Sequence, residues 1–196
     1  MDSFDGDCLL TDNEWEELVW VWKQTDVPKG CKVEIVKGRI TVAPYSAVSH
    51  HRLVEPMARH LIGAIPDSWG VYQRLALAVS SRHELYVPDL AVVPEEVLRR
   101  GDDCLAPADA AELVVEVTSA RTAETDRTTK VAGYADAGVP LYLLVDRLAP
   151  GGPTVVLYGE PKGGVYRVLH ACGFGAAVDL PRPIGFTLDA GLFPAK

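Results

Sequence analysis

The chain has 196 residues, of which 48% are hydrophobic and 23% charged. This size and balance are typical of one folded domain with a sizeable core and unlike a disordered chain. No apolar run approaches the roughly 20 residues that a spanning helix needs, and the start "MDSFDGD" lacks the basic region of a secretory signal, so we expect a cytoplasmic protein. The four cysteines are scattered without a close pair, which argues against a zinc site or a disulfide framework.

The charge is unevenly distributed along the chain. The formal net charge of −8 by itself disfavours nucleic acid as a partner, because phosphate binding needs a basic surface. Seven acids and no Lys or Arg lie within residues 1–17, so the remaining chain is nearly neutral and has room for a local basic groove. We expect residues 1–11 to be an acidic, flexible N-terminus and residues 12–196 to form a single domain.

Two helices and a hairpin are predicted at the start of the chain. A helix is expected over 12–23, because Thr11 and Glu14 have the spacing of a capping box. A hairpin follows around Lys37 and Gly38, and its alternating apolar residues are Val33, Ile35, Ile40 and Val42. A second helix is expected over 47–64, and the apolar stripe that it would bury consists of Val54, Met57, Ala58, Leu61 and Ile62.

Strands dominate the rest of the predicted fold, beginning with three near 70–79, 84–93 and 112–118. A third helix over 122–137 is closed by Gly138, and "VPLYLLVD" after it is a further strand, so this part is expected to form a βαβ crossover. From Gly151 onward, turns rich in Gly and Pro separate "TVVLYGE", "GVYRVLH" and "GFTLDA", which predict antiparallel strands. The expected fold class is mixed α/β (α+β).

Two of the predicted buried strands each carry one acid, Asp89 in "YVPDLAVV" and Glu116 in "ELVVEVTS". A buried ionised carboxylate is costly unless it is paired, hydrogen-bonded or bound to a metal. Pro88 removes one ladder hydrogen bond, so the strand is expected to be distorted where Asp89 lies. Carboxylates on adjacent strands can share a hard cation such as Mg²⁺ or Mn²⁺, which would activate water and stabilise charge on a phosphoryl oxygen.

The same residues carry a family resemblance. Pro88-Asp89 followed by Glu116 resembles the signature of the PD-(D/E)XK nuclease superfamily, but Thr118 stands where that signature has its lysine. The stretch "LVVEVTSARTAETDRTTKVAGYADAGVPLYLLVD" resembles the Uma-two (Uma2) family of putative restriction endonucleases, in which the lysine lies on the following helix, here at Lys130. The resemblance covers about Val33 to Asp146.

This resemblance has implications for fold and activity. It implies a restriction-endonuclease-like mixed central sheet flanked by helices, with an N-terminal helix and hairpin and extra C-terminal antiparallel strands. It also implies a Mg-dependent DNA endonuclease with Asp89, Glu116 and Lys130 as catalytic residues and the two acids as metal ligands. A nuclease that cuts both strands often works as a two-fold homodimer.

Helical spacing supports the displaced lysine without the family name. Asp126, Lys130 and Tyr134 lie at i, i+4 and i+8, so they share one helix face that begins just after the strand of Glu116. From there the Lys130 ammonium could orient or deprotonate a water molecule and offset phosphate charge. The alternative is an Asp126–Lys130 pair on the solvent-exposed surface, which stabilises a helix by only a few tenths of a kcal/mol.

Further candidates come from the first hairpin, the second helix and the arginines. Glu34 is a candidate further metal ligand, although a strand Glu that faces solvent is the simpler expectation. His50 is a candidate for contacting phosphate or orienting the site, whereas its neighbour His51 should be solvated, because at most one of the two can face inward. Candidate nucleic-acid contacts, for which ordinary surface charge is the alternative, are Arg74, Arg82, Arg121 and Arg127.

Three functions remain open from the sequence. The first is a Mg-dependent endonuclease acting on DNA. The second is a catalytically idle domain of the same fold that binds nucleic acid or a protein partner. The third is a metal-dependent hydrolase with another substrate. Retention of Asp89, Glu116 and Lys130 favours the first, because an idle domain would be free to lose them.

Overall fold

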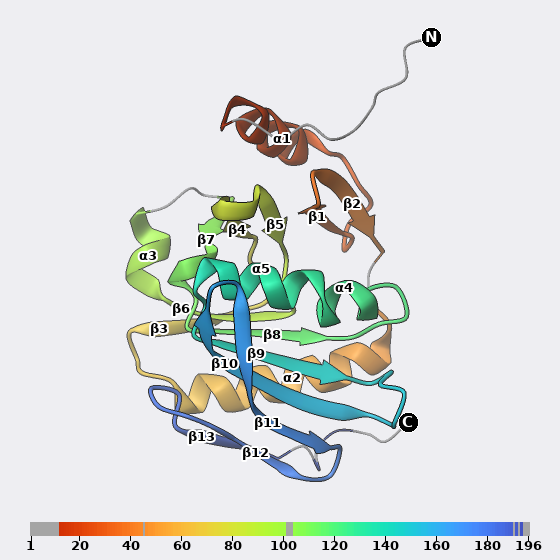
Figure 1. The fold of residues 1–196 in the computed structure, drawn as a ribbon, viewed down its shortest axis with the longest axis vertical. Coiled ribbons are helices and arrows are strands. Elements are labelled where there is room, and N and C mark those ends of the chain that lie inside the picture. The colour runs from red at the N-terminus through yellow and green to blue at the C-terminus, as the bar shows by residue number, and fades with distance from the viewer. Residues whose placement is uncertain (1–11, 45, 101–103, 190, 192, 194–196) are drawn as a thin grey trace.

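The computed structural model describes residues 12–44, 46–100, 104–189, 191 and 193. The acidic terminus predicted for residues 1–11 lies outside this range, and the single domain predicted for 12–196 stays a prediction. Within the described residues the chain forms two mixed sheets, a short two-stranded sheet and five α-helices (Figure 1). This is the mixed α/β architecture that the sequence predicts. No helix in this part of the chain is long and apolar enough to cross a membrane.

The larger sheet has six strands in the order β11-β10-β9-β8-β6-β3. Only the β8–β9 pair is parallel, and the chain between these two strands forms the short helices α4 (Ala123–Arg127) and α5 (Thr129–Ala137). The strands are β3 (Trp69–Tyr72), β6 (Leu90–Pro94), β8 (Leu113–Val117), β9 (Leu141–Asp146), β10 (Thr154–Lys162) and β11 (Val165–Gly173). The predicted crossover is therefore present, and the first two C-terminal strands extend the same sheet.

The smaller sheet has the order β2-β1-β5-β4-β7 and lies beside α1 (Asp12–Gln24) at the top of Figure 1. Its strands are β1 (Lys32–Val36), β2 (Arg39–Ala43), β4 (Leu77–Val79), β5 (Glu84–Tyr86) and β7 (Ala106–Pro107). The predicted hairpin is β1–β2, with Ile35 opposite Ile40. Ile35 is fully buried against aromatic and aliphatic side chains of α1, whereas Val42 is exposed, contrary to the predicted alternation.

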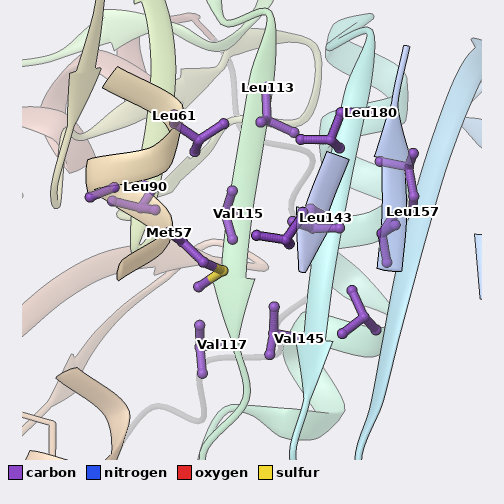
Figure 2. Close-up of a cluster of buried hydrophobic side chains, with 14 of the residues drawn as sticks. Met57, Leu61, Leu90, Leu113, Val115, Val117, Leu143, Val145, Leu157 and Leu180 are labelled. Carbon is purple, nitrogen blue, oxygen red and sulfur yellow. The ribbon is translucent and has the colours of Figure 1, made fainter. Parts of the chain in front are cut away.

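The main core fills the space between the larger sheet and α2 (Val48–Ala64). Figure 2 shows Leu61 of α2 near Leu113 of β8, and Met57 of α2 near Val115 of the same strand. The two-stranded sheet of β12 (Ala177–Leu180) and β13 (Phe186–Asp189) closes this core from below. The apolar stripe of α2 includes Leu53, and Ile62 is 62% exposed. The prediction that Ile62 belongs to this stripe was wrong. The buried side chains of Leu53, Met57 and Leu61 recur every four residues, and Ile62, one position further along the helix, points toward solvent.

Three predicted elements are each divided in two. The strand predicted over 70–79 is β3 and β4, which belong to different sheets, and Arg74 between them has a positive φ of 59°. The strand predicted over 84–93 is β5 and β6, interrupted around Pro88 as its missing N–H requires. The helix predicted over 122–137 breaks at Thr128, whose φ and ψ of −125° and −72° are not helical. The remaining helix, α3 (Glu95–Arg100), was not predicted.

Candidate functional site

Six ionisable side chains from both sheets and two helices meet between the two sheets, and we call them the acid–lysine cluster. Four are carboxylates and two are lysines. All four carboxylates are at most 6% exposed, and Lys130 is 1% exposed. The members are Glu34 and Lys32 from β1, Asp89 from the junction of β5 and β6, Glu116 from β8, Asp126 from α4 and Lys130 from α5.

Lys130 lies at the centre of the carboxylates. Its Nζ atom is 2.8 Å from Glu116 Oε1, 2.8 Å from Glu34 Oε1 and 3.4 Å from Asp126 Oδ1. The backbone N–H of Val87 also donates to Glu34 Oε1, at 2.7 Å. The pair of Asp126 and Lys130 is therefore buried rather than the surface pair that was the alternative, and Glu34 faces the interior rather than solvent.

Strand alternation explains why Glu116 reaches Lys130. Val115 and Val117 point into the core under α2, so Glu116 points to the opposite face of the sheet, where α4 and α5 lie (Figure 1). Because the β8–β9 pair is parallel, the intervening helices must pack back across that face. The lysine thus approaches the acid from the helix that follows the strand, as its spacing predicts.

Asp89 is held where the strand is interrupted. Its Oδ2 atom accepts a hydrogen bond from the backbone N–H of Val117 at 2.8 Å, and its Oδ1 atom lies 3.1 Å from His50 Nε2 and 2.5 Å from Lys32 Nζ. Burial alone would raise the pKa of Asp89, but the hydrogen bond with His50 and the charge of Lys32 hold that pKa well below its usual range. Asp89 is therefore ionised at neutral pH. His50 is buried and His51 exposed, as expected.

Sequence reasoning missed Lys32. Its Nζ atom contacts Asp89 and lies 4.0 Å from Glu116 Oε2, so both acids converge on one ammonium group. Lys32 stands two residues before Glu34 on the same strand, and residues at i and i+2 share a face of a strand. That spacing was the available signal, because once Glu34 is a candidate the same face carries Lys32.

The cluster is more acidic than basic. Four carboxylates face two ammonium groups, which leaves two formal negative charges in excess. Burial raises the pKa of Glu116 to about 8, although Lys130 acts in the opposite direction. Burial would lower the pKa of Lys130, but Glu116, Glu34 and Asp126 raise it well above its usual value, so Lys130 stays charged. The excess negative charge is relieved either by protons or by an added cation.

A cavity gives solvent access to this cluster. It has a volume of about 310 Å³, and Lys32, His50, Asp89, Glu116 and Arg121 are among its lining residues. A second hollow of about 200 Å³ reaches Glu34 and Lys130 from the β2 side and shares Arg121 with the first. Small anionic groups can therefore approach both the acid pair and Lys130.

The remaining predicted site residues are four arginines and Tyr134, and they differ in whether they line a hollow beside the cluster. Arg121 lines both hollows, and Arg74 lines a smaller one of about 40 Å³ together with Asp89. Arg82 instead pairs with Glu84 and Asp136, and Arg127 forms two hydrogen bonds to Asp146. Tyr134 is fully buried below the cluster, and its hydroxyl has no hydrogen-bond partner among the described residues.

The oxygen donors of Asp89 and Glu116 are suited to a hard divalent cation such as Mg²⁺. Both acids already surround the positive charge of Lys32, and the cluster carries excess negative charge. Among the described residues no group of three His, Cys, Asp or Glu side chains is arranged to hold a metal. A cation here would thus depend on two protein ligands and on water, a coordination that Mg²⁺ commonly accepts.

Comparisons with known proteins agree with this architecture. A crystal structure described as a putative nuclease belonging to DUF820 from Anabaena variabilis ATCC 29413 superposes with a TM-score of 0.68 at 16% identity, covering 91% of this chain and 96% of that one. This likeness shows a shared, restriction-endonuclease-like fold. No curated protein matches the sequence. The model of the Uma2 family, described as "Putative restriction endonuclease", matches residues 15–191, and the chain therefore belongs to this family.

Proposed function

We propose that this protein is a Mg²⁺- or Mn²⁺-dependent endonuclease that hydrolyses phosphodiester bonds in DNA. Asp89 and Glu116 are the proposed metal ligands and Lys130 is the proposed catalytic lysine, whereas Glu34, the further ligand that the sequence suggested, contacts the Lys130 ammonium. The family description and the nuclease description of the structural neighbour support the reaction class.

One observation carries the proposal: a solvent-accessible cavity ends at a buried cluster whose carboxylates outnumber its ammonium groups by two. Each of the four acids contacts a lysine, but two lysines cannot balance four ionised carboxylates, and buried charge in excess is costly. A divalent cation would compensate two charges in a single step. Protonation of Glu116, whose pKa burial raises to about 8, relieves this imbalance without a metal, and a divalent cation entering from the cavity would take the place of that proton.

The proposed reaction divides its tasks among these residues. A bound divalent cation supplies an activated water molecule and stabilises charge on the phosphoryl oxygens. Lys130 places a fixed positive charge beside Glu116, and since its raised pKa keeps it protonated, it would stabilise negative charge and orient water rather than remove a proton. Glu34 and Asp126 hold the ammonium in position. Arg121 at the cavity is the best-placed arginine for a DNA phosphate.

Plasmid cleavage with matched variants tests this function. Supercoiled plasmid is incubated with Mg²⁺, Mn²⁺ or a chelator, and Glu116→Gln is compared with Glu124→Gln, which neutralises an exposed acid on α4 near the site. We expect metal-dependent nicking by the wild type and by Glu124→Gln, and loss of nicking in Glu116→Gln, because an amide is a weaker ligand for a hard cation than a carboxylate. Equal cleavage by both variants would refute the role of Glu116.

One observation favours the idle binding domain instead. Lys32 and Lys130 already contact Asp89, Glu116 and Glu34, so these three acids have partners without any metal. If no divalent cation binds and no nuclease substrate is cut, this second function takes the place of the first.

A further inference from the structure

The ammonium group of Lys32 occupies the position at which the proposed reaction needs a divalent cation. Its ammonium contacts Asp89 Oδ1 and lies 4.0 Å from Glu116 Oε2, and these are the two acids assigned to the metal. A positive side chain among metal ligands opposes a cation, because like charges at short range disfavour each other. The ammonium and a divalent cation therefore compete for the same oxygens.

The surroundings of Lys32 allow it to leave this position. Three acids hold Lys130, whose side chain is 2% exposed, whereas the Lys32 side chain is 13% exposed. It lines both the 310 Å³ cavity and the 40 Å³ hollow, so open space adjoins its side chain. A flexible four-carbon stem lets a lysine ammonium move by several ångströms while its backbone stays fixed.

Building on the proposed function, we infer that Lys32 exchanges partners. Without metal it neutralises Asp89 and Glu116, and with metal it turns into the cavity and pairs with a phosphate of the DNA backbone. The displaced ammonium would then lie in the cavity that Arg121 also lines, whereas Lys130 stays bound to its own acids. Lys32 thus keeps the cluster stable before metal binds and positions the substrate afterwards.

The first test measures metal binding alone. Lys32→Gln removes the charge and keeps an N–H donor for Asp89, and Lys162→Met removes an exposed charge on the distant β10–β11 hairpin as a control. In calorimetric titrations with Mg²⁺, Lys32→Gln should bind roughly tenfold more tightly than the wild type, since one nearby charge commonly shifts an ionic equilibrium by a factor of ten or more. An unchanged or weaker Mg²⁺ affinity of Lys32→Gln would overturn the proposed exchange of partners, because it is the result expected if Lys32 only supports the two acids.

The second test measures DNA binding by fluorescence anisotropy of a labelled duplex in Ca²⁺, between about 50 and 200 mM salt. Loss of one phosphate contact should weaken binding by Lys32→Gln and lower the slope of log K against log salt by about 0.9. Lys162→Met should keep the wild-type slope, and Lys32→Arg should keep most of it because the charge remains. If Lys32→Gln binds metal more tightly but keeps the full slope, the phosphate contact is refuted.

These outcomes separate this inference from the proposed function. A wild type that binds no divalent cation and cuts no DNA refutes the proposed function itself. A wild type that binds metal and cuts, combined with Lys32→Gln values equal to those of Lys162→Met, refutes only the role of Lys32. Thermal unfolding of each variant confirms that the compared proteins are folded, and Lys32→Met replaces Lys32→Gln if the latter is not.

Discussion

Replacement of Lys130 by methionine tests the buried network most severely. Met has a similar volume but no charge, so the variant leaves Glu116, Glu34 and Asp126 without the ammonium that all three contact. Breaking a buried ion pair by removing one partner typically costs about 3–5 kcal/mol. For a chain of this size, about 1 kcal/mol corresponds to roughly 2–4 °C in Tm, so we expect Tm to fall by about 6–20 °C. The sequence alone left open whether Lys130 is buried or exposed, and its burial is what makes this loss large.

Protonation of Glu116 should make this loss depend on pH. Its pKa is raised in the folded protein to about 8 from 4.5, so its protonated form favours the folded state. The resulting stabilisation is fully present below about pH 4.5 and is lost as pH rises through 8. The destabilisation by Lys130→Met should therefore be larger at pH 9 than at pH 6.

Urea unfolding followed by tryptophan fluorescence measures these differences. Arg59→Ala is the control, because Arg59 and Glu55 also lie at i and i+4 but are 76% and 57% exposed, and breaking this pair should change the free energy of unfolding by less than about 0.5 kcal/mol. The double variant Lys130→Met/Glu116→Gln should recover part of the loss. If Lys130→Met lowers the free energy of unfolding by less than about 1 kcal/mol at pH 9, Lys130 does not hold these acids together and the account of the cluster is refuted.

Three further predictions concern pH, packing and DNA contacts. The raised pKa of Glu116 lets protons compete with the metal, so the Mg²⁺ affinity should rise between pH 6 and about 8 and level off at higher pH. A Mg²⁺ affinity that calorimetry finds to be independent of pH would contradict this. Gly133→Ala should destabilise the protein by about 1–3 kcal/mol in urea unfolding, because the new Cβ would lie 2.4 Å from the Tyr86 hydroxyl. This hydroxyl cannot easily move away, since it donates a hydrogen bond to Glu84. An unchanged urea midpoint would count against this packing. Arg121→Ala should weaken DNA binding and reduce its salt dependence, whereas Arg82→Ala should not, because Arg82 is paired with Glu84 and Asp136; equal effects in the anisotropy assay would argue against Arg121 as the contact.

Local sequence patterns predicted which side chains meet better than they predicted how the strands are divided between the two sheets. The acids on adjacent strands and the i, i+4 spacing of Asp126 and Lys130 correctly indicated side chains that meet. Pro88 correctly marked the interruption at Asp89, because a residue without an N–H disrupts a ladder wherever it occurs. These signals are local in the chain, and the structure adds to them chiefly the burial that local patterns leave undetermined.

Non-local pairing accounts for most of the errors. The division of 70–79 and 84–93 between two sheets depends on strands that pair far along the chain, and no local pattern specifies such partners. The break at Thr128 has neither a Gly nor a Pro to mark it. Lys32 was missed for a related reason, because a lysine on a strand usually faces solvent, and its i, i+2 spacing from Glu34 points inward only once Glu34 is known to face the cluster.

Calorimetric titration of Mg²⁺ and Mn²⁺ into the wild type and Asp89→Asn, followed by incubation of the same samples with supercoiled plasmid, tests the central claim most directly. The amide introduced by Asp89→Asn keeps an oxygen that can accept the Val117 N–H, and thermal unfolding of the variant checks that it stays folded although Lys32 loses its anionic partner. The account predicts metal binding and metal-dependent nicking in the wild type and neither in the variant. Absence of metal binding in the wild type, or undiminished nicking by Asp89→Asn, would contradict it.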